Sequence, residues 1–268
     1  MASLLPLGGP TRALVRPPGN SFRAAISSTA ARIDPVLARR QHAEYCGALR
    51  EAGVDVTVLE ADERYPDACF MQDPALVLGG LAVIGRSGAA SRTGEEETLA
   101  PLLAERFPIA RIVAPGTLEG GDVMVLPDRV LVGASGRTNR AGIAQLALAL
   151  SQRRGPDGAW VDPIPVVEEL RVAGALHLLS VATTLGPDAI LATPDYAGLP
   201  AFRGLEVVTA PDEPHAANVL AIRSFVIVPA ENLTTAALLR SLGFTVLAVP
   251  VSEFAKADGG VTCLSLLW

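Results

Sequence analysis

One pattern recurs along this chain: a polar residue, a short apolar run, a turn and a second apolar run. Two β-rich runs around a short turn predict a β-hairpin. The leading polar residues follow one another at intervals of about 40 to 55 positions, which is typical of repeat proteins that close into a ring. The sequence therefore predicts five hairpin units in a closed array. The five leading residues are Asp73, Asp122, His177, Asn218 and Cys263.

The fifth unit lacks its second strand, because only a short apolar run follows Cys263 before Trp268. Residues 11–16, near the start of the sequence, form a β-rich run that no other unit uses. We therefore expect the two ends of the chain to share one unit and close the ring.

Helical periodicity fills the segments between hairpins, where apolar residues recur at spacings of three and four. Asp34 precedes Pro35 as a capping residue would, and Gly53 stands just past the expected end of that helix. The predicted helices are 35–52, 95–106, 140–152 and 234–242. Alternating strands and helices predict an α/β fold.

A radial array would bring the polar residues together. If the first strand of each unit lines the axis, the residue before it lies at a common mouth, so Asp73, Asp122, His177 and Cys263 become neighbours. A thiol at the junction of a turn and a strand can be exposed to a ligand while its backbone stays fixed, which favours a nucleophilic role for Cys263.

Composition narrows the class of function. The 268 residues are half apolar, and we expect one domain over residues 1–268. A net charge of −6 argues against a nucleic-acid surface and suits a cationic small molecule. No apolar run reaches the length of a membrane span, and residues 1–9 lack the features of a signal peptide. Cys46, Cys69 and Cys263 have no paired spacing, which favours the cytoplasm, and neither a metal nor another cofactor is predicted.

Six short segments follow one another along nearly the whole chain: residues 66–73, 118–123, 135–139, 176–178, 217–218 and 256–268. Together they resemble the dimethylarginine dimethylaminohydrolases of the guanidino-group-modifying, or pentein, superfamily. The resemblance implies a fivefold pseudo-symmetric α/β propeller of ββαβ units. It also implies hydrolysis of asymmetric dimethylarginine or monomethylarginine to citrulline and a methylamine.

The resemblance assigns three catalytic residues. A guanidinium carbon resists water, so the reaction needs a strong nucleophile and a proton for the departing amine. Cys263 matches the nucleophile that forms a thiouronium intermediate. His177 matches the group that protonates the amine and then activates water. Glu119, beside two glycines, matches the acid that orients the histidine.

Six further residues match the substrate-binding positions of the family. Asp73 corresponds to the acid that binds the guanidinium and Asp67 to a second acid on the substrate side, and Arg92 and Arg137 correspond to a pair that binds the amino-acid carboxylate. The remaining two are Gln72 and Ala257.

Departures from the family pattern concern the substrate. Gln72 stands where glutamate is usual, and Leu179 stands where lysine is common. Residues 17–20 fall at the family's flap, without a contact residue that could be assigned.

Other functions stay open on the sequence alone. Free arginine is one alternative substrate, although arginine deiminases carry a helical insertion for which this chain has no room. Agmatine lacks the carboxylate that two arginines would bind. A propeller without catalysis, serving as a binding module, is a third alternative. A homodimer through the sheet edges is also open.

Overall fold

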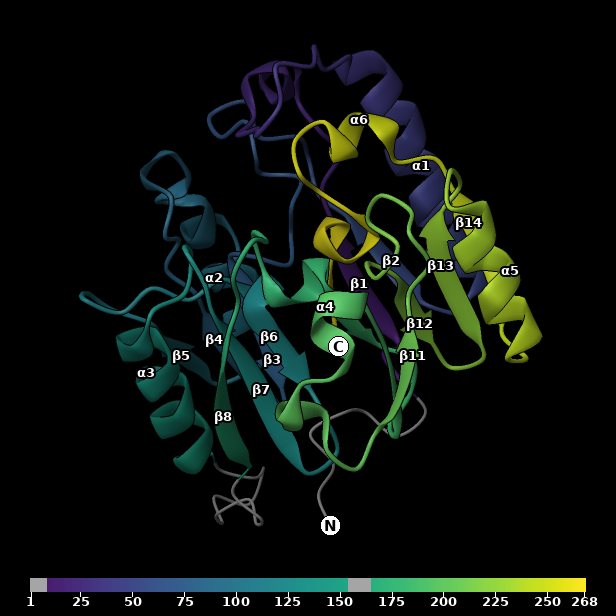
Figure 1. Ribbon diagram of the computed structural model, residues 1–268. Coiled ribbons are helices and arrows are strands. Elements are labelled where there is room, and N and C mark those ends of the chain that lie inside the picture. Colours follow the sequence, from purple (N-terminus) through teal and green to yellow (C-terminus); the bar gives the residue numbers. More distant parts are fainter. Residues whose placement is uncertain (1–8, 154–164) are drawn as a thin grey trace.

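Five small sheets surround a common axis (Figure 1). The computed structural model describes residues 9–153 and 165–268. Within these ranges every sheet has three strands, and its middle strand pairs antiparallel with one neighbour and parallel with the other. Grouped by sheet, the strands are β3 (Ala75–Leu78), β4 (Leu81–Ile84) and β5 (Ile109–Arg111); β6 (Val123–Val125), β7 (Arg129–Ala134) and β8 (Val166–Arg171); β9 (Ala182–Thr184), β10 (Ala189–Ala192) and β11 (Glu206–Thr209); β12 (Leu220–Ile222), β13 (Phe225–Pro229) and β14 (Thr245–Val249); and β15 (Ser265–Leu267), β1 (Arg12–Val15) and β2 (Asp55–Val58).

The first strand of each hairpin lines the axis, as the repeat predicts. Residues of β3, β6, β9, β12 and β15 together enclose an axial cavity of about 210 Å³. The predicted α/β propeller with five pseudo-equivalent units is therefore confirmed.

The two ends of the described chain meet in one sheet, which confirms the expected closure of the ring. Strand β1 pairs antiparallel with β15, so that Ala13 lies opposite Leu267. The backbone N–H groups of Thr11 and Arg12 both donate to the carbonyl oxygen of Trp268, at 2.9 and 3.0 Å. Strand β2 then completes this sheet on the other side of β1.

Three of the four predicted helices are confirmed. Helix α1 begins after Asp34, whose side chain accepts hydrogen bonds from the N–H groups of Val36 and Leu37. The expected helix at 95–106 is instead a 3₁₀ turn, Glu95–Thr98, followed by a short α2, because Pro101 has no N–H to continue the helical hydrogen bonds. The α-helices are α1 (Pro35–Glu51), α2 (Ala100–Ala104), α3 (Arg140–Ser151), α4 (Pro194–Ala197), α5 (Leu233–Ser241) and α6 (Ser252–Ala255).

Three of the leading segments contain a 3₁₀ turn before the axial strand. The apolar run after His177, which the repeat predicts to be a strand from its start, first forms such a turn at Leu178–Ser180, and β9 begins only at Ala182. The N–H of Leu178 donates to the Asp122 carboxylate at 3.0 Å rather than to a neighbouring strand. Equivalent turns, Gly120–Asp122 and Val261–Leu264, precede β6 and β15. These turns carry the polar residues to the mouth of the axis.

The apolar core is divided into five clusters, each of which fills the space between two neighbouring sheets. In one of them, Leu146 of α3 and Val130 of β7 pack against Val83 of β4, and all three are fully buried. Burial of each such side chain stabilises the fold by about 1.5 to 3 kcal/mol. The ring is thus held together at the contacts between its units.

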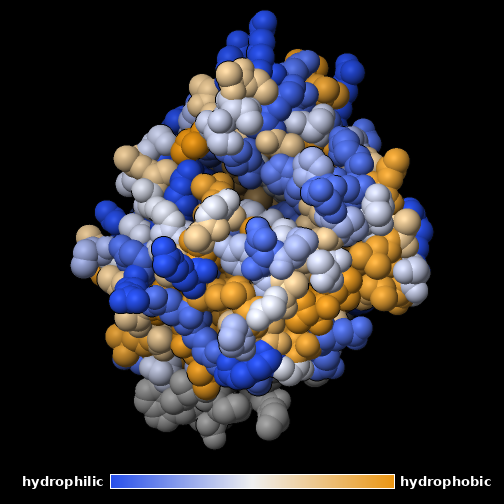
Figure 2. Space-filling model, in the orientation of Figure 1, coloured by the Kyte–Doolittle hydropathy of each residue, from blue (hydrophilic) through white to orange (hydrophobic). Residues whose placement is uncertain are grey.

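The outer surface is mixed in character. Helices α3 and α5 lie at the periphery in Figure 1, and Figure 2 shows hydrophilic residues interspersed with apolar ones on the same face. Among the residues that the structure describes, none of the helices combines the length and the apolar character that crossing a membrane requires. Residues 1–8, on which the expectation about a signal peptide depends, lie outside the described residues.

Candidate active site

A small pocket lies at the mouth of the axis, where the leading segments of several units meet. Seven of the nine site residues predicted from the sequence line it, together with five others. The predicted ones are Asp67, Asp73, Arg92, Arg137, His177, Ala257 and Cys263; the others are Ile26, Phe70, Leu176, Asp258 and Gly259. Residues far apart in the sequence are therefore neighbours in space, as a radial array requires.

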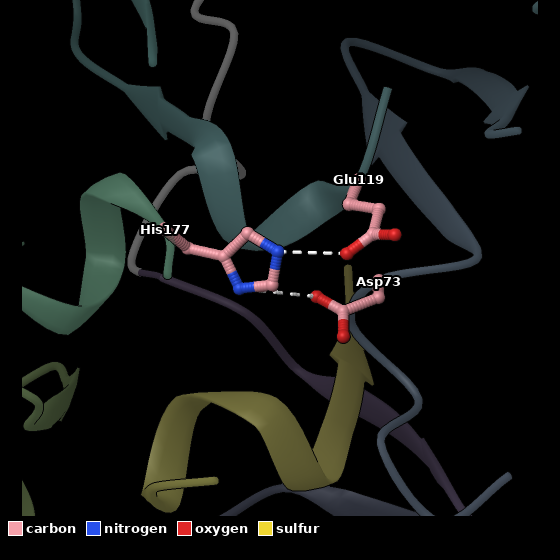
Figure 3. A group of neighbouring side chains, drawn as sticks. All are labelled: Asp73, Glu119 and His177. Carbon is pink, nitrogen blue, oxygen red and sulfur yellow. Dashed lines mark hydrogen bonds and ion pairs between the residues drawn. The ribbon is translucent and has the colours of Figure 1, made fainter. Parts of the chain in front are cut away.

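The imidazole of His177 faces two carboxylates, those of Glu119 and Asp73 (Figure 3). Its Nε2 is 2.7 Å from Glu119 Oε2, and its Nδ1 is 3.9 Å from Asp73 Oδ1. Gly121 makes this approach possible, because a Cβ at that position would be 2.7 Å from His177 Nδ1. Both ring nitrogens thus face an acid, which fixes the orientation of the imidazole.

Glu119 accepts further hydrogen bonds from groups that sequence reasoning did not identify. Its Oε1 accepts hydrogen bonds from the Ser87 hydroxyl at 2.5 Å and from the N–H of Gly88 at 3.0 Å. This leaves Oε2 for His177. Ser87 lies far from Glu119 in the sequence, so only the folded chain shows that they meet.

These contacts change the ionisation of the pair. Burial opposes a charge on the imidazole, yet the charge of Asp73 and the hydrogen bond of Glu119 raise the pKa of His177 above its usual value. Burial also opposes a charge on Glu119, but the hydrogen bond and the charge of His177 outweigh it and lower the pKa of that carboxyl. Both shifts favour an imidazolium next to a carboxylate, and the imidazolium is a ready proton donor.

Cys263 lies within the 3₁₀ turn Val261–Leu264, with its side chain partly exposed to the pocket. Its Sγ accepts from the N–H of Gly260 at 3.5 Å and lies 3.9 Å from Thr262 Oγ1. Burial, followed by the charge of Asp73, raises the pKa of this thiol to about 11. Without a bound cationic ligand, the raised pKa favours the thiol form of Cys263 over the thiolate.

Asp73 and Arg92 form a buried ion pair on the wall of the pocket. Arg92 Nη1 donates to Asp73 Oδ2 at 2.5 Å, and its other nitrogens donate to Glu95 and to the carbonyl oxygen of Phe70. Sequence reasoning missed Glu95, because a run of three glutamates at a helix start is typical of a solvated surface. Most of the donors of Arg92 are therefore engaged within the protein. Its role as a ligand of the substrate carboxylate stays a prediction.

Asp67 and Ile26 close the pocket on another side. Both carboxylate oxygens of Asp67 lie within hydrogen-bonding distance of the Ile26 N–H, at 3.2 and 3.3 Å. Two further bonds fix this segment, since the N–H and the hydroxyl of Ser28 both donate to Asp258. In the described part of the chain, the covering segment is therefore the one around Ile26. Residues 17–20, expected at the flap, are not among those that line the pocket, and the N–H groups of Asn20 and Ser21 donate to Glu63.

Three predicted residues have different surroundings. Arg137 lines the pocket and its Nη1 lies 3.6 Å from Glu119 Oε1. Ala257 is buried at the rim. Gln72, in contrast, lines the axial cavity, and its contact with the site is made by its backbone N–H, which donates to the carbonyl oxygen of Cys263 at 3.2 Å.

The charged cluster has the spacing of a metal site but is already internally paired. Single ligand atoms of Asp73, Glu119 and His177 lie within 4.8 Å of one another. Glu119 binds the imidazole, and Asp73 binds the guanidinium of Arg92. The arrangement can hold a proton and bind a cation without a metal, and the absence of a metal stays a prediction.

Known proteins are similar to this chain over nearly its whole length. Residues 16–154 match the family model described as N,N dimethylarginine dimethylhydrolase, eukaryotic. The chain is 35% identical over 257 residues to the N(G),N(G)-dimethylarginine dimethylaminohydrolase of Pseudomonas aeruginosa, with 94% of this chain and 97% of the relative covered. It is 34% identical over 261 residues to the protein of the same name from Streptomyces coelicolor, with 95% and 96% covered.

Similarity of structure covers the same length. The Pseudomonas aeruginosa protein, as a cysteine-to-serine mutant complexed with citrulline, superposes with a TM-score of 0.89 at 33% identity, over 97% of this chain and 99% of that one. Sequence and structure match over nearly the whole of both chains. The protein therefore belongs to the dimethylarginine dimethylaminohydrolase family, a family of hydrolytic enzymes.

Proposed function

We propose that this enzyme hydrolyses Nω-methylated arginine to citrulline and a methylamine through a thiouronium intermediate on Cys263. One observation carries the proposal: the Cys263 thiol and the His177 imidazole line the same pocket, and the imidazole faces two carboxylates. The relative from Pseudomonas aeruginosa supports the same product, since its structure contains citrulline.

The charges of the pocket suit a guanidino amino acid. Asp67 and Asp73 are buried carboxylates on its wall, and they would bind the guanidinium through charge-assisted hydrogen bonds. Arg137 also lines the pocket, and its guanidinium would bind the substrate carboxylate. Binding the two ends of the substrate separately would fix its central carbon next to Cys263.

The bound cation would activate the nucleophile. Because burial and the charge of Asp73 raise the pKa of Cys263, a guanidinium placed against its sulfur should lower that pKa again. The thiol proton leaves to solvent, and the thiolate attacks the guanidinium carbon, so that a C–S bond forms and one electron pair of the C=N bond moves onto nitrogen. In the tetrahedral adduct this electron pair stays on nitrogen. It forms a C=N bond again when the amine departs.

His177 would supply and then remove a proton. Its Nε2 is engaged by Glu119, so the proton on Nδ1 is the one that faces the pocket. Its transfer to the methylated nitrogen breaks the C–N bond and releases methylamine or dimethylamine. The neutral imidazole then accepts a proton from water, whose oxygen adds to the carbon. Cleavage of the C–S bond, with transfer of the hydroxyl proton of the adduct to the departing sulfur, releases citrulline and restores the Cys263 thiol.

Entry of the substrate requires movement of the covering segment. The pocket holds only about 20 Å³ of free space, roughly the room for one water molecule. Displacement of Ile26 would break its N–H bond to Asp67 and free that carboxylate for the guanidinium. Opening of the pocket and exposure of a binding group would therefore be one event.

Product analysis tests the proposal. Purified protein is incubated with asymmetric dimethylarginine, monomethylarginine, arginine and agmatine, and citrulline and the released amines are quantified. We expect citrulline and methylamines from the first two substrates. Cys69→Ser serves as a matched control, because Cys69 is a fully buried cysteine outside the site and its loss should leave turnover in place. If citrulline forms from arginine alone, arginine is the substrate in place of methylated arginine. The lack of any product would favour a binding module.

A further inference from the structure

Asn218 connects the two segments that carry the reacting groups. It leads the fourth unit, has no role in the mechanism above, and is 2% exposed. Its Nδ2 donates to the carbonyl oxygen of Leu179 at 2.9 Å, in the turn that follows His177. The same nitrogen donates to Thr262 Oγ1 at 2.8 Å, next to the nucleophile.

The contact on the nucleophile side is a closed ring of two hydrogen bonds. Asn218 Oδ1 accepts from the backbone N–H of Thr262 at 3.2 Å, while Asn218 Nδ2 donates to the hydroxyl of the same residue. Gly260 leaves room for this amide, because a Cβ there would lie 2.3 Å from Asn218 Oδ1. The backbone before Cys263 is therefore shaped around this side chain.

The hydroxyl of Thr262 is oriented by the same contact. Its oxygen accepts from Asn218, so its proton points elsewhere, and its other contact is with Cys263 Sγ at 3.9 Å. The N–H of Gly260 lies 3.5 Å from that sulfur. With the Thr262 hydroxyl as donor, two donors surround the sulfur from its own turn, and hydrogen bonds to the charged form favour a thiolate.

We propose that Asn218 and Thr262 are positioning residues for the nucleophile: Asn218 fixes the turn of Cys263 against the turn of His177, and Thr262 directs its hydroxyl proton at Cys263 Sγ. This inference rests on the proposed function for its link to turnover. It concerns the reactivity of Cys263 itself, which can be measured without any substrate.

Other charged groups around Cys263 act on its thiolate as well. Asp73 opposes the thiolate and Arg92 favours it. His177, Asp67 and Arg137 lie around the same pocket. Substitutions at Thr262 leave these five charged groups in place. A change in the pH profile of Cys263 reactivity would therefore be due to the loss of the hydroxyl.

Alkylation of Cys263 by iodoacetamide, followed by mass spectrometry of its peptide across pH 6 to 11, tests the role of the hydroxyl. Thr262→Val should slow alkylation at neutral pH by about threefold to tenfold and shift the profile to higher pH, as expected for one lost hydrogen bond. Thr262→Ser should restore the wild-type profile. Thr235→Val is the control, since this fully buried threonine donates instead to Glu213. Equal profiles for wild type and Thr262→Val would refute the role of the hydroxyl.

Turnover and stability test the role of the amide. Asn218→Leu should lower kcat by about tenfold to a hundredfold with little change in KM, because the two catalytic turns lose their common bond while the substrate contacts remain. The matched control is Asn232→Leu: this amide is equally buried, but it donates to the carbonyl oxygen of Pro214, away from the pocket. Both variants should lose similar stability in urea. A similar fall in kcat in both would show that Asn218 is merely structural.

The two hypotheses fail in different ways. If wild-type protein turns over no methylated arginine, the proposed function is wrong, but the alkylation profiles still decide whether Thr262 favours the thiolate. If turnover is found and the Thr262 profiles coincide, the proposed function stands and the positioning role of Thr262 is wrong.

Discussion

Replacement of Glu119 by glutamine would change one charge at the centre of the site. The amide oxygen can still accept from the Ser87 hydroxyl and the Gly88 N–H, as Oε1 does in the native protein. The amide nitrogen then faces His177 Nε2 and donates a hydrogen to it. The imidazole must accept at Nε2 and keep its single proton on Nδ1, so Glu119→Gln produces a neutral ring in a fixed tautomer.

The size of the effect follows from the lost contact. A buried hydrogen bond to a charged partner contributes about 1.5 to 3 kcal/mol. Because Glu119 Oε2 makes this bond at 2.7 Å and both side chains are almost fully buried, we expect the whole range to apply. This free energy corresponds to a decrease by a factor of about ten to a hundred and fifty in the protonated fraction of His177, at pH values above its pKa. The pKa of His177 should therefore fall, and the alkaline limb of kcat should move to lower pH.

The assay is the pH dependence of kcat with asymmetric dimethylarginine for wild type, Glu119→Gln and a matched control, Glu253→Gln. Glu253 is also buried and ion-paired, with Lys256, but it does not contact His177. We expect kcat of Glu119→Gln to be lower by about tenfold to a hundredfold at pH 8. An unchanged alkaline limb in Glu119→Gln, or the same shift in Glu253→Gln, would refute the reasoning.

Three further predictions concern other parts of the molecule. Cys263→Ser should abolish turnover with an unchanged circular dichroism spectrum, because a serine hydroxyl without a strong base cannot attack a guanidinium; measurable citrulline would exclude the covalent route. Arg137→Ala should weaken binding of a methylarginine by about tenfold to a hundredfold but spare a carboxylate-free guanidine, and equal losses in kinetics on both would show a structural role. Burial lowers the pKa of His42 to about 4. Since the unfolded chain then binds the extra proton below about pH 6.5, wild type should lose about 2 kcal/mol of unfolding free energy between pH 7 and 5. His42→Leu should lose less in urea titrations at the two pH values, and equal losses would contradict this assignment.

Much of the ring could be predicted because its signals are local. Hairpin runs such as those of β3 and β4 are apolar and bounded by Gly79 and Gly80, and the capping of α1 is written in Asp34 and Pro35. The outer strands left no comparable signal, because a strand such as β2 is short and largely exposed. Pro101 causes the break before α2. In the sequence, the helical spacing of the residues around it outweighs this signal, so a single helix is predicted.

The candidate site divides in the same way. Cys263, His177 and Asp73 lead repeated units, so their convergence follows from the order of the chain once the ring is assumed. Ile26 and Ser87 carry no such signal. Ile26 contributes a backbone N–H, which every residue except proline has, and Ser87 meets Glu119 only because of the path of a loop. Such contacts depend on the folded backbone rather than on residue type.

The shared sheet of β15 and β1 has a consequence for how activity develops during folding. Ala13 and Leu267 pair across about 250 positions, and contacts of such long range are slow to form. Cys263 lies in the turn that leads directly into β15, whereas His177 and Glu119 belong to units made of nearby segments. A chain whose other four units have formed would thus carry the proton donor but hold its nucleophile in no defined place. Appearance of the reactive thiol should therefore coincide with closure of the ring.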